Sequence, residues 1–203
     1  MLVIDDFDKD YYDFEDSAVF LTGKKEREAR LAFAKRIELL IGEYPNVSEL
    51  YHKLGLCFYN LSKWEDEDKK IIETSFHRAL LIDQNSIFSL LFLTFFYFDI
   101  ECYQLSLKSY EQLLNNDLKK EIPSWRLTKL VCIKLSCLIY LHAIETDSLS
   151  FELDKLLESF ANLEEDESDA AQPIELLKAL KESVHINNAK VMGQVKLLSH
   201  LAK

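Results

Sequence analysis

Turn-forming residues are scarce in this chain. It contains four glycines and three prolines among 203 residues, while 48% of its residues are apolar. A sheet of many strands needs glycine and proline at its turns, so this composition disfavours an all-β fold. The apolar content is sufficient for a real core. The sequence therefore predicts an all-α protein.

Cysteine motifs are also missing. The four cysteines, Cys57, Cys102, Cys132 and Cys137, lie inside apolar helical patterns and form no CxxC pair. Cysteine is often simply a small buried apolar residue. We therefore expect buried free thiols rather than a metal or redox site.

Sequence motifs for catalysis are absent as well. Four glycines scattered at positions 23, 42, 55 and 193 cannot build a phosphate-binding loop. There is no Ser-centred elbow, no HExxH and no DxDxDG sequence. The histidines show no ligand spacing; they are His52, His77, His142, His185 and His200. We expect a protein that is not an enzyme and that holds no metal or cofactor.

Signals for export or membrane insertion are not apparent. The first residues, MLVIDDFDKD, contain neither a basic n-region nor a long apolar h-region, so we expect no secretory signal and a cytoplasmic location. The most apolar stretch, NSIFSLLFLTFFYFDI at 85–100, is shorter than the roughly 20 residues that a bilayer requires. It is predicted to be a buried central helix, not a membrane span.

Negative charge is concentrated in two segments. Residues 1–22 carry a net charge of −6 and residues 164–169, EEDESD, carry −5, which together account for the net charge of −11. Such a field repels nucleic-acid phosphates and anionic lipid, so neither is expected to be a direct partner. A basic protein is the electrostatically favoured partner.

The remaining sequence is a succession of amphipathic helical patterns. Apolar residues recur at spacings of three and four, which predicts helices over 24–43, 48–61, a segment ending near 81, 86–100, 103–115 and 123–145. Further helical stretches are predicted from Ser150, at 173–183 and at 188–202. We expect about eight helices that form a single domain over residues 24–203.

Two stretches of this pattern repeat. SFHRALLID at 75–83 and SYEQLLNND at 109–117 place Ser, an aromatic residue, Leu and Asp in the same register, 34 positions apart. The preceding helices carry Tyr51, Leu54, Gly55 and Phe58 in one unit and Leu90, Leu93, Thr94 and Tyr97 in the next. The pattern resembles the tetratricopeptide repeat, a helical hairpin of about 34 residues. The resemblance is good over residues 24–118 and weaker over 119–203.

This resemblance implies antiparallel hairpins stacked as a short α-solenoid with a protein-binding groove. The implied groove residues are Glu49, His52, Tyr59, Asn60, Phe88, Leu91, Phe95, Phe98, Asp99 and Trp125. The carboxylate clamp of Lys and Asn that one subgroup carries is not expected, because His52 and Leu56 stand where its donors belong. A tetratricopeptide-like adaptor or secretion chaperone that binds an amphipathic segment is one hypothesis. The alternative is that the chain's own helices cover this face.

The N-terminal segment 1–23 is predicted to be an acidic, aromatic arm. Its candidate partner-binding residues are Asp5, Asp6, Asp8, Asp10, Tyr11, Tyr12, Asp13 and Phe14. Aromatic anchors ringed by acids suit a basic protein surface. The alternative is that the aromatic residues pack on the first helix of this same chain while the acids face water.

Two functional hypotheses follow from these features. The first is a non-catalytic cytoplasmic inhibitor, an immunity-type protein that neutralises a basic partner such as a nuclease toxin. The second is the groove-binding adaptor. A homodimer that shares the apolar helix is a third, minor expectation.

Overall fold

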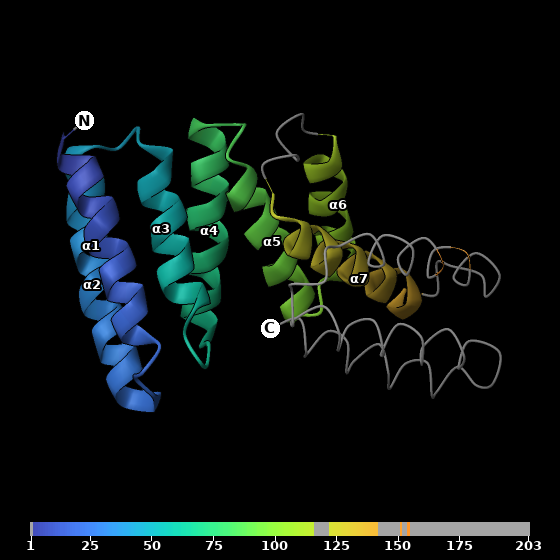
Figure 1. Ribbon diagram of the computed structural model, residues 1–203, viewed down its shortest axis with the longest axis horizontal. Helices are drawn as coiled ribbons and strands as arrows, with labels where there is room; N and C mark the ends of the chain where they lie inside the picture. The colour runs from blue at the N-terminus through green and yellow to red at the C-terminus, as the bar shows by residue number, and fades with distance from the viewer. Residues whose placement is uncertain (1, 116–121, 142–150, 152–153, 155–203) are drawn as a thin grey trace. The chain divides into compact units, whose positions relative to one another are not determined.

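The structure, a computed structural model, describes residues 2–115 and 122–141 together with residues 151 and 154. Within this part of the chain every regular element is an α-helix, which confirms the all-α prediction (Figure 1). The helices are α1 (Leu2–Ala18), α2 (Gly23–Glu43), α3 (Ser48–Tyr59), α4 (Asp66–Ile82), α5 (Ile87–Asp99), α6 (Tyr103–Leu114) and α7 (Ser124–Tyr140). About eight had been expected. The stretches predicted at 173–183 and 188–202, and the acidic segment 164–169, lie outside the described residues.

The chain divides into two compact units, Met1–Phe96 and Tyr97–Lys203, and the division falls within α5. We had expected an arm to end and a domain to begin between residues 23 and 24. That point is the start of α2 and lies inside the first unit. The N-terminal segment predicted as an acidic, aromatic arm contains helix α1 of this unit.

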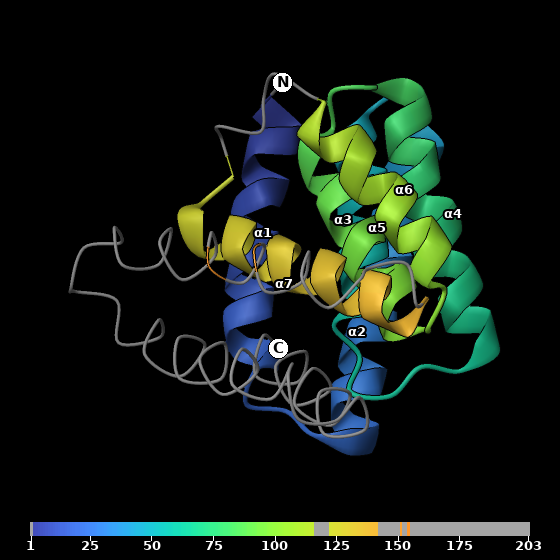
Figure 2. The same ribbon diagram turned by 90° about the vertical axis from the view of Figure 1, so that its right-hand side faces the viewer.

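The first unit is built from helices that pack on their neighbours in sequence. α1 contacts α2, α2 contacts α3, and α3 contacts α4. Figures 1 and 2 show these helices running side by side and alternating in direction. Short connections force this alternation, because a chain that reverses within a few residues places the next helix antiparallel to the last.

Local sequence signals set several helix boundaries. α4 begins where the backbone N–H of Glu65 donates to the Asp68 carboxylate at 2.8 Å, which satisfies one of the free donors at a helix start. Before α5, the Asp83 carboxylate accepts the N–H of Asn85 at 2.9 Å and fixes the turn. Pro123 immediately precedes α7, where its missing N–H costs nothing.

The α3–α4 hairpin is closely packed around Gly55. A Cβ at this position would lie 2.7 Å from the nearest ring carbon of Phe76. Phe76 is completely buried, as are Ile72 and Ala79 on the same helix. The ring therefore occupies the space that any larger residue at position 55 would need.

In the second unit, α6 packs on α7. The rings of Tyr103 and Tyr140 stack with centroids 4.6 Å apart, and burial raises the pKa of Tyr103 to about 12. Cys132 and Cys137 are buried, as expected, but Cys102 is exposed because it stands at the N-cap of α6. Among the described helices, none has the length and apolarity that crossing a membrane requires.

Candidate functional site

The inner face of α1 packs against α2 through aromatic rings. Phe7 and Tyr11 are buried, and with Phe14 they follow the helical spacing of four and three. All three meet Phe33 of α2: its ring centroid is 5.8 Å from that of Phe7, 5.9 Å from that of Tyr11 and 4.3 Å from that of Phe14. Tyr11 and Phe14 were candidate partner-binding residues. The structure instead places them against the first predicted helix of the same chain.

A buried lysine from α3 lies beneath α1. Lys53 is only 2% exposed, and its Nζ lies 3.0 Å from Asp8 Oδ1 and 3.2 Å from Glu49 Oε1. The same ammonium lies 4.7 Å from the ring centroid of Tyr11 and 5.0 Å from that of Tyr12. Two carboxylates and two aromatic faces thus offset the loss of water around this charge.

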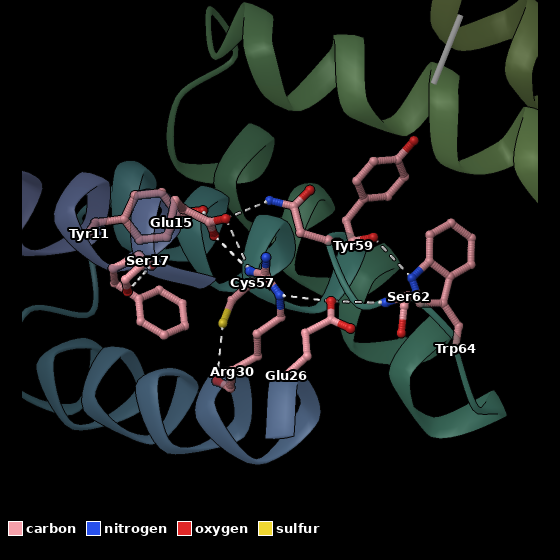
Figure 3. Close-up of polar contacts among 11 residues, drawn as sticks. Tyr11, Glu15, Ser17, Glu26, Arg30, Cys57, Tyr59, Ser62 and Trp64 are labelled. Carbon is pink, nitrogen blue, oxygen red and sulfur yellow. Dashed lines mark hydrogen bonds and ion pairs between the residues drawn. The ribbon is translucent and has the colours of Figure 1, made fainter. Parts of the chain in front are cut away.

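A second buried cation, Arg30 of α2, holds the other end of α1 (Figure 3). Its Nη1 donates to both oxygens of Glu15, at 2.9 and 3.1 Å, and its Nε donates to Glu26 at 3.4 Å. Burial lowers the pKa of Arg30, but the hydrogen bond and charge of Glu15 outweigh burial, so the pKa is raised overall. Asn60 also donates to Glu15 at 3.2 Å, which links α1 to the end of α3.

The buried groups beside Arg30 are kept neutral. The Cys57 thiol donates to the Arg30 backbone carbonyl at 3.2 Å, and burial raises its pKa to about 12. Burial and the nearby Glu15 carboxylate raise the pKa of Tyr11, whose hydroxyl donates to Glu15 at 3.0 Å. The Cys57 bond joins α3 to α2 and the Tyr11 bond lies within α1. Both groups are poorly suited to nucleophilic chemistry, because the reactive form of each is its anion.

A third ion pair between α1 and the other helices lies at the surface, where Arg36 Nη2 meets Asp10 Oδ2 at 2.8 Å. Asp8, Asp10 and Glu15 are therefore all paired with bases of α2 or α3. Much of the acidity that marked the N-terminal segment as a partner-binding arm is used to attach α1 to its own protein.

The outer face of α1 is different. Tyr12 is 63% exposed, and Asp13 and Asp16 are exposed with no ion pair among the described residues. The side chains of Asp5 and Asp6 lie outside the described part of the structure. We call Tyr12, Asp13 and Asp16 the outer acidic face.

The predicted groove residues of α5 are largely covered. Leu91, Phe95 and Phe98 are buried, and Phe88 is half-buried. Burial of the first three disfavours the groove hypothesis, because a docking face must be reachable. The periodicity of α5 did not reveal which side is covered, because apolar residues occupy all of its faces.

The other groove candidates have separate roles. His52 is buried with its Nδ1 3.0 Å from Ser89 Oγ. The Tyr59 carbonyl accepts the Trp64 indole N–H at 3.0 Å. Glu49 pairs with Lys53, Asn60 bonds Glu15, and Asp99 is half-buried. The side chain of Trp125 lies outside the described residues.

Sequence reasoning missed the basic partners of α1. Arg30, Arg36 and Lys53 lie in ordinary amphipathic patterns, and only the fold brings them to α1. Asp16 was also absent from the predicted partner-binding residues of the N-terminal segment. A weak signal existed: Arg30, Phe33 and Ile37 share one helical face, and an arginine on an otherwise apolar face calls for an acid.

No group of three or more His, Cys, Asp or Glu residues that could hold a metal ion occurs in the described ranges. Comparisons with protein-family models, with curated proteins and with solved structures found no significant match. The tetratricopeptide-like solenoid therefore stays a prediction.

Proposed function

We propose that this protein is a non-catalytic binding protein that holds a basic partner protein on the outer acidic face of α1. Its most specific form is a cytoplasmic neutraliser of a basic protein such as a nuclease toxin. The observation that carries the proposal is the exposure of Tyr12, Asp13 and Asp16 on a helix that pairs Asp8, Asp10 and Glu15 with bases of the same chain.

Charge and shape both support this assignment. Exposed carboxylates that form no ion pair attract cationic surfaces and accelerate association. An exposed tyrosine among them supplies the rigid, amphipathic contact area that is typical of interface anchors. The Lys53 ammonium lies 5.0 Å from the centroid of the Tyr12 ring, a cation–π contact that favours this position of the ring.

The position of Asp16 adds to the case. It lies in the last turn of α1, which contains no basic residue. A negative charge there opposes the helix dipole and is mildly unfavourable for folding. Stability does not require an acid at position 16. Its presence there is consistent with selection for binding.

The test is affinity capture from the native host with the tagged full-length protein, beside the D13K/D16K variant. The matched control is E38K/E43K, which reverses two exposed acids on α2 that have no ion pair among the described residues. We expect a basic protein to be captured by the wild type and by E38K/E43K but not by D13K/D16K. Its association rate should fall as salt concentration rises.

Two results would overturn the proposal. One is capture of the same partner by all three proteins, which would place the binding surface elsewhere. The other is a captured partner that is acidic or neutral and whose association is insensitive to salt. Thermal unfolding of each variant shows whether a loss of capture reflects lost folding instead.

A further inference from the structure

The surface of α2 and α3 that α1 covers is complementary to an acidic, aromatic helix. Phe33 contacts three aromatic rings, and Arg30, Arg36 and Lys53 meet three carboxylates of α1. Both parts of this contact are encoded in the same chain. A second copy of the chain therefore presents a helix that fits this surface with identical contacts.

The connection between α1 and α2 is a short turn. It consists of residues 19–22, and Gly23 after it takes a left-handed conformation with φ of 57°. Nothing lies within 4 Å of the place where a Cβ on Gly23 would be, so glycine is required there by backbone conformation and not by space. The segment contains no proline, so it could also continue as helix.

Two hinge residues are left exposed by the closed arrangement. Val19 is 73% exposed and Phe20 is 85% exposed, and both belong to this short connection. Large apolar side chains at a turn cost free energy in water. When the hinge straightens in two copies that exchange α1, their hinge segments run together and these side chains can cover one another.

We propose that α1 exchanges between two copies of this chain, each copy docking its α1 on the α2–α3 surface of the other. The proposal concerns self-association and does not rest on the proposed function. The closed and exchanged forms share the Phe33 contacts and the three ion pairs. They differ at the hinge, where Gly23 leaves the left-handed region, and in their dependence on protein concentration.

Gly23→Ala tests the hinge directly. Alanine disfavours the left-handed conformation of the closed form and leaves all contacts of α1 intact. Because each exchanged dimer relieves two hinges, the dimerisation constant should rise at least about tenfold. The control is Gly42→Ala, another exposed position with no atom near the added Cβ and no left-handed backbone. Size-exclusion chromatography with light scattering should show more dimer for G23A only.

A mixing experiment identifies the interface. The D10K substitution puts two positive charges at the pair of positions 10 and 36, and R36E puts two negative charges there. Each variant alone therefore has like charges facing each other. An exchanged heterodimer restores opposite charges at both copies of the contact. With one protein labelled with ¹⁵N, native mass spectrometry should find heterodimer above the statistical fraction.

Each negative outcome overturns the proposal. If G23A folds and remains as monomeric as G42A at every concentration, the hinge does not open. If dimer forms but the D10K and R36E proteins mix statistically, the dimer uses another surface. Both charge variants lie at a half-exposed surface pair, so folding is retained for this measurement.

Discussion

The Nζ of Lys53 lies 3.0 Å from Asp8 Oδ1. An almost completely buried lysine of α3 is thus paired with an acid of the N-terminal helix. This pair predicts an asymmetric mutational response. Asp8→Ala leaves Glu49 as the carboxylate that pairs with the ammonium and should lower the free energy of unfolding by about 1–3 kcal/mol. Lys53→Met should cost less, because it removes the charge and keeps the apolar stem.

A double-mutant cycle in urea checks this response. D8A, K53M and D8A/K53M are compared with the wild type, and the double variant should be more stable than D8A. If D8A and D8A/K53M prove equally unstable, Asp8 does not stabilise the buried charge.

Phe33 is the second test of how α1 is attached. Phe33→Ala removes a buried ring that three aromatic residues of α1 contact, and it should destabilise the protein by about 3–5 kcal/mol. The exposed Leu39 on the same helix is the control, since Leu39→Ala should change stability by less than about 0.5 kcal/mol. Equal effects in urea unfolding would show that the ring cluster is not the anchor.

Gly55→Ala should act against the usual propensity rule. Alanine is normally favoured over glycine within a helix by about 1 kcal/mol. Here the added Cβ would meet the Phe76 ring at 2.7 Å, so we expect a net destabilisation of about 1–3 kcal/mol. Gly42→Ala lacks this contact and should stabilise. If Gly55→Ala raises the free energy of unfolding as much as Gly42→Ala does, α3 and α4 are less closely packed than described.

The cysteines predict both reactivity and pH dependence. Cys102 is exposed, whereas Cys57, Cys132 and Cys137 are buried with pKa values raised to about 12, 12 and 11. One thiol should therefore react rapidly with a disulfide reagent under native conditions, and three only on unfolding. Rapid reaction of C102S at any thiol would contradict this description.

The same thiols set the sign of a stability change at alkaline pH. Unfolded thiols ionise near pH 8.5, while the buried ones hold their protons to higher pH. The folded state then binds more protons than the unfolded state, so stability falls as pH rises from about 8.5 toward about 12. Replacing the three buried cysteines with alanine should flatten this part of the curve, which urea unfolding at several pH values measures.

The helices could be predicted from the sequence because their apolar periodicity is a local property. The bounds of α2, α3, α5 and α6 lie within two residues of those expected. The face of α5 could not be predicted, since a helix apolar on all sides gives no direction, and Leu91 and Phe95 proved to be buried.

The candidate site was harder to predict because charge pairing is a property of the fold. Asp8, Asp10 and Asp13 look alike in the sequence, yet only the first two meet a base. Tyr11 and Tyr12 are neighbours in sequence, but helical geometry buries one and exposes the other. What the pattern did predict is the chemistry of the segment, with acids and aromatic residues on one short stretch.

The most direct test of this account is hydrogen exchange of the α1 backbone amides, measured by mass spectrometry at neutral pH. Both proposals require α1 to be a docked helix with one inner and one outer face. We expect slow exchange over residues 7–18 in the wild type and a marked loss of protection there in F33A, whereas L39A, which keeps the ring cluster, should retain it. Exchange of α1 at the rate of an unfolded chain in the wild type would contradict the account.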